Sequence, residues 1–261
     1  MIRSLLFVLA ILVPAGLRAS PAVLSAAHAH NDYAHARPLH EALERGFGSV
    51  EADVHLAGGQ LLVGHDAREL RPERTLAALY LEPLAEAARR NGGRIHAGGP
   101  ALTLLVDLKT AAAPTYAALD AELARYPELF TTFSAGSTTL RAVTVIVSGN
   151  RPKAELATQP LRRAALDGRP DDLAANPPAG LVPWISENWS KFSRWQGEGG
   201  LPADDREKVS SLVRRAHAQG RLVRFWGTAD RPAVWRELRA LGIDVIGADD
   251  LAGLQRFLTA P

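Results

Sequence analysis

The amino-acid sequence predicts a single (β/α)8 TIM barrel, regular or distorted, over residues 21–261. Short apolar runs alternate with Ala-, Arg- and Leu-rich segments of helical character, and this alternation is typical of a parallel sheet flanked by helices. About eight such units follow one another, and a closed barrel of this kind needs ~250 residues. Polar residues gather where nearly every apolar run ends, so we expect a site at the C-terminal ends of the strands. A doubly wound open sheet would show the same alternation and is the second interpretation.

The expected strands follow the apolar runs in chain order. They cover Val23–Ala27, Ser49–Val54, Leu102–Leu108, Ala142–Ser148, Gly180–Ile185, Leu222–Trp226 and Asp244–Ile246. A weaker run at Arg163–Leu166 is the candidate for the eighth barrel strand. Leu61–Val63 is expected to form a small extra strand.

The expected helices lie between these runs. They cover Pro38–Arg45, Leu76–Asn91, Pro114–Tyr126, Pro152–Ala157, Asp204–Gln219, Arg231–Leu241 and Asp249–Leu258. Pro38 and Pro114 suit the first turn of a helix, and Asp204 suits an N-cap. Gly220 and Gly242 stand just past helix ends, where glycine commonly occupies the C′ position.

The first 20 residues differ from the rest of the chain. Arg3 precedes an apolar run over residues 5–13, followed by small residues up to Ser20, which is the order of a secretory signal peptide. The run is shorter than the ~20 residues of a membrane span, although an uncleaved anchor is the alternative. We therefore expect an exported protein, periplasmic or secreted, with no transmembrane span after cleavage.

Charge and cysteine content narrow the possible functions. Cleavage would remove two basic residues and leave 28 basic against 28 acidic ones, so no nucleic-acid partner is expected. The absence of cysteine excludes disulfides, thiolate catalysis and Cys-ligated zinc. We expect a monomer.

Two carboxylates stand two residues apart at the end of a predicted strand. Glu51 and Asp53 share one face of that strand, and their mutual repulsion favours a cation between them. Asp107 and Lys109 share a face of another predicted strand. If these faces point into the barrel, three carboxylates meet at one mouth, which suits one divalent cation, Mg²⁺ or Ca²⁺, better than zinc. Lys109 beside that cation indicates an anionic ligand, and phosphate is the obvious anion.

Four motifs add a family resemblance: HAHNDY at 28–33, EAD at 51–53, HD at 65–66 and DLKT at 107–110. Through them the chain resembles the phospholipase C-like phosphodiesterase superfamily, which includes glycerophosphodiester phosphodiesterases and sphingomyelinases D. The chain looks most like the subgroup of altered inheritance of mitochondria protein 6. The resemblance implies a phosphoric diester hydrolase with Glu51, Asp53 and Asp107 as metal ligands and Lys109 facing the phosphate.

The resemblance also implies acid–base catalysis by two histidines. One histidine takes a proton from the nucleophile and the other gives one to the leaving oxygen, roles that histidine suits at neutral pH. The pair is His28 as base and His65 as acid, or the reverse, with His30 as the alternative to His28. His28 with Asn31 three residues on matches the sphingomyelinase D pattern and favours His28. Asn31 and Trp226 are candidate substrate contacts.

The substrate class stays broad. Glycerophosphodiesterases carry His-Arg-Gly and Pro-Glu-Asn segments that this chain lacks, which puts glycerol-type specificity in doubt. We expect a small phosphodiester or a lysophospholipid-type substrate, with a role in lipid metabolism. Two other functions compete: a metal-dependent amidohydrolase, because His28-Ala29-His30 is a His-x-His pattern, and a non-catalytic exported binding protein on the same fold.

Overall fold

Eight parallel strands close into a barrel in the computed structural model, which describes residues 22–134 and 136–260. In barrel order they are β1 (Leu24–Ala29), β2 (Phe47–Ala57), β4 (Leu102–Leu108), β7 (Val143–Gly149), β9 (Ala164–Gly168), β10 (Trp184–Asn188), β11 (Leu222–Trp226) and β12 (Val245–Ala248). The barrel is closed because β1 pairs in parallel with both β2 and β12. The predicted (β/α)8 barrel is therefore confirmed, and the open sheet is excluded.

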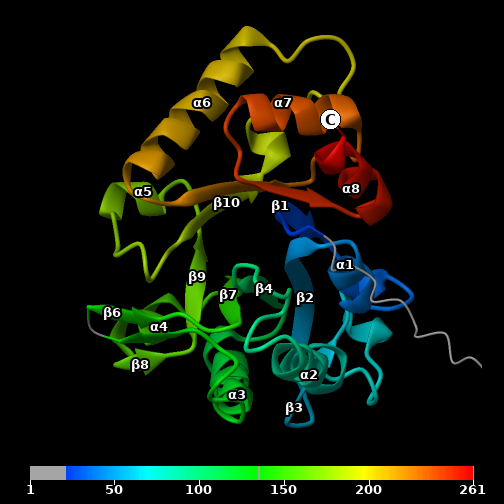
Figure 1. The fold of residues 1–261 in the computed structure, drawn as a ribbon. Coiled ribbons are helices and arrows are strands. Elements are labelled where there is room, and N and C mark those ends of the chain that lie inside the picture. The colour runs from blue at the N-terminus through cyan, green and yellow to red at the C-terminus, as the bar shows by residue number, and fades with distance from the viewer. Residues whose placement is uncertain (1–21, 135, 261) are drawn as a thin grey trace, which may run out of the picture.

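A helix follows each barrel strand. These are α1 (His40–Glu44), α2 (Glu82–Arg90), α3 (Ala112–Ala124), α4 (Lys153–Thr158), α5 (Asp172–Ala175), α6 (Ala203–Ala218), α7 (Pro232–Ala240) and α8 (Leu251–Thr259). A π-helical turn over Ala77–Leu81 leads into α2. Figure 1 shows α6, α7 and α8 along the upper side of the barrel and α2 and α3 along the lower side. The main core lies between strands and helices, where the buried aliphatic side chains of both pack together.

The inside of the barrel is layered, and the layers place polar side chains at one end. A small apolar cluster lies inside: Leu105, Ile146, Trp184 and Val245. Asp107, Ser148 and Ser186 stand two residues further along three of these strands and therefore point the same way. The register continues this polar layer around the barrel, since Asp107 pairs with Ser148 and Ser186 with Arg224. The C-terminal ends of the strands thus carry the polar layer above an apolar plug.

The strands differ from the expected runs where polar residues face inward. Strand β10 begins at Trp184 instead of Gly180, because Pro183 lacks the N–H of a ladder residue, and it continues through the polar Ser186 and Glu187. The weak run at 163–166 is strand β9, whose interior position is taken by Asp167. An apolar pattern does not reveal strand residues that face a polar interior.

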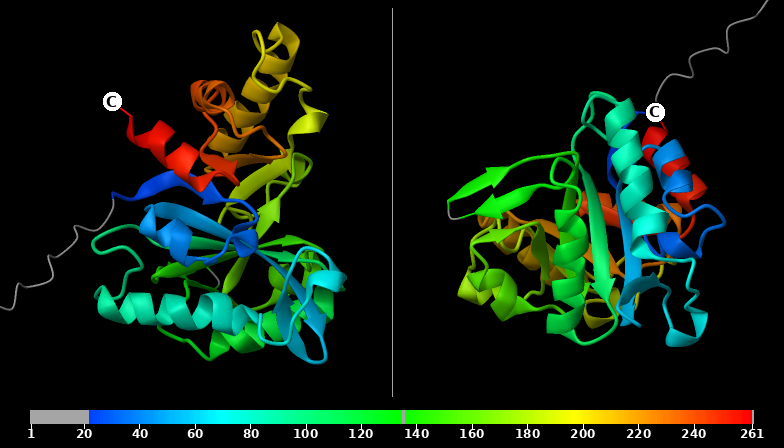
Figure 2. Two further views of the ribbon diagram at one scale, coloured as in Figure 1. Left: turned by 90° about the vertical axis from the view of Figure 1, so that its right-hand side faces the viewer. Right: turned by 90° about the horizontal axis from the view of Figure 1, so that it is seen from below.

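Among the described residues, four strands lie outside the barrel, and only one of them was predicted. A three-stranded antiparallel sheet forms from β5 (Thr132–Ser134), β6 (Ser137–Thr139) and β8 (Leu161–Arg162), and Figure 2 shows β5 and β6 projecting from the barrel. These strands precede β7 and β9, so they lie at the end of the barrel away from the polar layer. The extra strand predicted at 61–63 is β3 (Gln60–Val63), which runs antiparallel to β2.

The expected signal peptide, residues 1–20, lies outside the described residues. Within residues 22–134 and 136–260, no helix has the length and apolar character needed to cross a membrane.

Candidate active site

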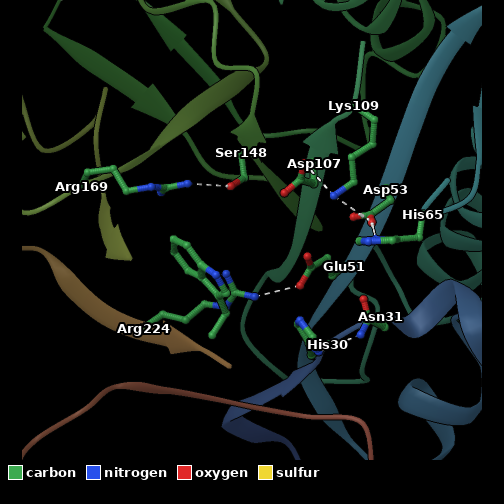
Figure 3. A pocket seen from close by; sticks show the side chains of 11 residues that line it. His30, Asn31, Glu51, Asp53, His65, Asp107, Lys109, Ser148, Arg169 and Arg224 are labelled. Atoms are coloured by element: carbon green, nitrogen blue, oxygen red, sulfur yellow. Dashed lines mark hydrogen bonds and ion pairs between the residues drawn. The ribbon is translucent and has the colours of Figure 1, made fainter. Parts of the chain in front are cut away.

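A pocket of about 180 Å³ opens at the C-terminal ends of the barrel strands (Figure 3). Its lining consists of His30, Asn31, Glu51, Asp53, His65, Asp107, Lys109, Ser148, Arg169, Arg224 and Trp226. These residues come from six of the eight barrel strands or from the loops that follow them. Of the catalytic, metal-binding and substrate-contact candidates named from the sequence, all except His28 line this pocket.

The three carboxylates predicted as metal ligands lie together. One oxygen from each of Glu51, Asp53 and Asp107 can be chosen so that all lie within 4.8 Å of one another. Asp53 and Asp107 are direct neighbours across strands β2 and β4. The Oδ1 atom of Asp53 is buried without a hydrogen-bond partner among the described residues, which is costly unless something binds it. This all-oxygen cluster fits a hard divalent cation.

Lys109 neutralises only part of this negative charge. Its Nζ lies 3.0 Å from Asp53 Oδ2 and 3.3 Å from Asp107 Oδ1. Burial raises the pKa of Asp107 to about 6, and the attraction of Lys109 offsets this effect only in part. Burial lowers the pKa of Lys109, but the neighbouring Asp107 and Asp53 more than reverse this, so its pKa lies above the usual value. The site therefore still favours an additional positive charge.

His28 is fully buried beneath the pocket. Its Nδ1 lies 2.7 Å from Ser49 Oγ, and its Nε2 lies 3.0 Å from Glu51 Oε2. Burial, and then the charge of Arg224, lower the pKa of His28 to about 4, so the ring is neutral at neutral pH. Both ring nitrogens are bonded, and the ring packs edge-on against Trp184. His28 thus orients Glu51 from below.

His30, in contrast, faces the pocket. Its Nδ1 lies 2.8 Å from Asp249 Oδ1, and Nε2 has no hydrogen-bond partner in the described part of the chain. Burial lowers the pKa of His30, but the hydrogen bond to Asp249 and the charge of Glu51 outweigh it, so its pKa lies above the usual value. The Asp230 carboxylate accepts hydrogen bonds from the backbone N–H groups of Asp249 and Asp250. This second carboxylate fixes the loop that presents Asp249 to His30.

His65 lies at the rim on the other side of the carboxylates. Its side chain is 60% exposed, and its Nδ1 lies 2.9 Å from Asp53 Oδ2. The Tyr33 hydroxyl lies 2.7 Å from that same oxygen and 2.7 Å from Asn31 Oδ1. Tyr33 therefore links Asn31 to Asp53. The structure brings His30 and His65 to one pocket together with the three carboxylates.

Two residues with a clear place in this pocket, Arg224 and Arg169, had no role in the sequence interpretation. Arg224 is almost fully buried and donates to Glu51 Oε2 at 2.8 Å, and its charge, with the hydrogen bond from His28, lowers the pKa of Glu51 against the effect of burial. Arg169 and Ser148 line the far wall. The alternation of Arg224 with Trp226 on one strand was visible in the sequence, but nothing there indicated that Arg224 meets a carboxylate 173 positions away.

The closed (β/α)8 barrel, with its carboxylates, histidines and basic groups at the C-terminal ends of the strands, defines the structural class of the protein. Residues 20–166 match the sequence profile described as AIM6-like phosphodiesterase domain. The match covers more than half of the chain, so the chain belongs to the AIM6-like phosphodiesterase family, which confirms the predicted resemblance.

Curated relatives agree with this assignment. The chain is 30% identical over 275 residues to altered inheritance of mitochondria protein 6 from Eremothecium gossypii, covering 90% of this chain and 70% of the relative. It is 27% identical over 264 residues to the homologue from Arthroderma benhamiae, covering 86% and 81%. A glycerophosphodiester phosphodiesterase from Agrobacterium tumefaciens aligns over 91% of this chain and 99% of its own, with a TM-score of 0.48 and 16% identity. That structural likeness is too distant to carry an argument.

The relatives contradict the predicted location. We predicted an exported protein, periplasmic or secreted, from the character of residues 1–20. The relatives carry a name that refers to the inheritance of mitochondria, and this does not fit a protein that leaves the cell. An apolar N-terminal run following an arginine is a compositional signal that does not specify export by itself. The prediction of export is therefore wrong.

Proposed function

We propose that the protein is a metal-dependent phosphoric diester hydrolase whose acid–base pair is His30 and His65. The observation that carries this proposal is a cluster of three carboxylates that shares one pocket with two histidines. Glu51, Asp53 and Asp107 would hold one divalent cation, Mg²⁺ or Ca²⁺. A bound cation of this kind would stabilise the negative charge that develops on the phosphate oxygens.

His30 is assigned to proton uptake. Its Nε2 faces the pocket while Nδ1 is bonded to Asp249, and a carboxylate on the far ring nitrogen stabilises the imidazolium that forms. His65 is assigned to proton donation to the leaving oxygen. Its partner, Asp53, divides its hydrogen bonding among His65, Tyr33 and Lys109. The nucleophile is water or a neighbouring hydroxyl of the substrate.

His28 takes a supporting role in this proposal. A general base must reach its proton at about 2.6–3.2 Å, and His28 is fully buried with both nitrogens bonded. The same burial argues against an amidohydrolase-type zinc site, because His28 and His30 do not face one cavity. We therefore assign the catalytic role to His30 instead of His28.

The proposed substrate is a small phosphodiester or a lysophospholipid-type molecule. The basic groups of the pocket, Lys109, Arg169 and Arg224, surround the carboxylates, which suits an anionic ligand bound beside a cation. Asn31 and Trp226 line the same pocket and are proposed substrate contacts.

The test is phosphorus NMR of products formed with added Mg²⁺ or Ca²⁺. The substrates are an aryl phosphodiester, glycerophosphodiesters, phosphoinositides and lysophospholipids, and the variants are H30A, H65A and H28A. H30A and H65A should each lower kcat by ~10²–10⁴ with the thermal midpoint unchanged. H28A should mainly lower the free energy of unfolding, by about 2–4 kcal/mol.

Two results would count against the proposal. Full activity in both H30A and H65A would reject the histidine assignment. A folded wild-type protein that cleaves none of these diesters with either cation would favour a binding protein on the same fold.

A further inference from the structure

The wall of the pocket away from Lys109 is built around a carboxylate with no role in the proposed chemistry. Asp167, on strand β9, is fully buried inside the barrel. Its two oxygens accept hydrogen bonds from Ser148 at 2.9 Å, Ser186 at 2.5 Å and Arg169 Nη1 at 2.8 Å. Three neighbouring strands, β7, β9 and β10, thus contribute to one buried polar network.

The network holds one guanidinium at the pocket. Arg169 Nη2 lies 3.3 Å from Ser148 Oγ, and the guanidinium carbon lies 4.8 Å from the centre of the Trp226 ring. A hydrogen bond, an ion pair and an aromatic face therefore fix the plane of the guanidinium. The Arg169 side chain is 20% exposed and lines the pocket. Figure 3 shows Arg169 on the opposite side of the pocket from Lys109.

The backbone beneath Arg169 is fixed as well. Its N–H donates to Asp172 Oδ2 at 2.8 Å, and Lys153 Nζ holds the other oxygen of that carboxylate at 2.6 Å. Arg151 donates to the carbonyl of Asp167 at 2.7 Å. The loop that carries Arg169 is therefore bonded to Asp172 of α5, which Lys153 of α4 holds in turn, and the guanidinium is positioned before any ligand arrives.

Such an arrangement is costly if its purpose is only structural. Burying an ion pair removes two charges from water, and apolar residues in the same place are often as stabilising or more so. The unfavourable desolvation free energy is expected where a charged group must be held in one place for a ligand. Arginine presents a planar set of donors that matches the oxygens of a phosphate.

Building on the proposed function, we propose that Arg169, positioned by Asp167 and Ser148 against Trp226, forms an anion subsite for a phosphate of the substrate. The subsite begins one strand from the carboxylates, since Ser148 pairs with Asp107 across β4 and β7. Neighbouring strands lie ~4.8 Å apart, so the subsite is within reach of the diester phosphate or of a second phosphate on its alcohol.

The first test measures binding and needs no turnover. Inorganic phosphate is titrated by calorimetry into the wild-type protein, R169Q and R169K in the presence of Mg²⁺. R169Q should weaken phosphate binding at least ~10-fold, and R169K should fall between it and wild type because it keeps the charge but loses the planar donors. R162Q is the matched control, because Arg162 also stacks on an aromatic ring, Phe133, and donates to backbone carbonyls, but at the other end of the barrel.

The second test identifies the source of the phosphate. The ratio kcat/KM is compared for an aryl phosphodiester and for a glycerophosphoinositol that carries an additional phosphomonoester. Equal losses in R169Q on both substrates assign the subsite to the scissile diester, and a loss confined to the second substrate assigns it to the additional phosphate; either result supports the subsite.

Wild-type phosphate affinity in R169Q, with correct folding shown by a native circular dichroism spectrum and a cooperative unfolding transition, would overturn the proposal. Because phosphate binding is measured without turnover, a protein that cleaves no diester would reject the proposed function and leave the subsite to be decided by calorimetry.

Discussion

The two walls of the pocket differ in how the charges of their side chains are balanced. The carboxylate wall has three acids for one ammonium. It is formed by Glu51, Asp53, Asp107 and Lys109, on β2, β4 and the residue that follows β4. The guanidinium wall is formed by Ser148, Asp167, Arg169, Ser186 and Arg224, on β7, β9, β10, β11 and the loop after β9. Arg169 pairs with Asp167 of the same wall, and Arg224 pairs with Glu51 of the carboxylate wall. The first wall gains stability from an added cation, whereas the second presents fixed positive groups to an anion.

An ion pair joins the two walls. Arg224 of the guanidinium wall donates to Glu51 of the carboxylate wall at 2.8 Å, and His28 supports that same Glu51 oxygen from below. A phosphate bound with a cation would lie between a wall that supplies oxygens and a wall that supplies nitrogens. The difference explains how one small cavity accommodates both a cation and an anion.

Among changes to the two walls, the largest effect is expected from neutralising the carboxylate wall with D53N. The substitution removes charge from the acid whose Oδ1 has no partner among the described residues, so cation affinity should fall by roughly 100-fold and kcat/KM by ~10²–10³. Calorimetric titration with Mg²⁺ and Ca²⁺ and an activity assay measure both. E86Q, on the exposed face of α2, is the control. Wild-type cation affinity in D53N would contradict the assignment of the carboxylate wall as the cation site.

Breaking the contact between the walls should cost stability. R224M leaves Glu51 buried without its guanidinium partner, so the free energy of unfolding should fall by about 3–5 kcal/mol. R214M breaks an ion pair of similar length, 2.7 Å to Glu207, whose side chains are 63% and 70% exposed, and should cost less than about 1 kcal/mol. Urea unfolding of both variants makes the comparison. Equal losses would show that burial of the Arg224–Glu51 pair does not matter.

The carboxylate wall should also release protons when a cation binds. The folded pKa of Asp107 is about 6, above its unfolded value of ~3.9, so ionising Asp107 opposes folding of the cation-free protein as pH rises through 6. A bound cation favours the ionised form of Asp107. Its binding should therefore release roughly half a proton from Asp107 at pH 6 and almost none at pH 8. Calorimetry in buffers of different ionisation enthalpy measures the release. D107N should lose this component, and the same release at both pH values would contradict the assignment.

The smallest effect is expected at Trp226, at the edge of the guanidinium wall. W226L removes the ring under Arg169 but leaves the carboxylates of both walls in place. KM should therefore rise about 3–10-fold with kcat nearly constant. W195L, outside the pocket, is the matched control. A fall in kcat without a change in KM would place Trp226 in the reaction itself.

The two walls also show what the sequence can reveal. The carboxylate wall is local: Glu51 and Asp53 are two residues apart, and strand alternation together with the barrel period brings Asp107 and Lys109 to the same mouth. The guanidinium wall draws Ser148, Asp167 and Arg224 from strands far apart in the chain, each as a single polar residue. Polar residues inside a strand weaken the apolar pattern, which is why β9 gave only a weak signal and the end of β10, through Ser186 and Glu187, was missed.

The histidine cluster shows the limit of spacing arguments. His28 and His30 share a face of an ideal strand, yet β1 ends at Ala29 and the backbone turns at Asn31, whose φ is 50°. His28 stays in the barrel interior and His30 reaches the pocket. The strand end and the left-handed residue that follows it decide which histidine meets the substrate, and neither is visible as a pattern.

The most direct test of the central claim is the rate of phosphodiester cleavage with the cation removed and restored. The wild-type protein is treated with a chelator, assayed on the best diester of the NMR panel, and assayed again after Mg²⁺ or Ca²⁺ is added back. We predict a rate at least ~100-fold lower in chelator, which the wild-type protein recovers when the cation is added back and D53N does not. Undiminished cleavage in chelator would contradict this prediction.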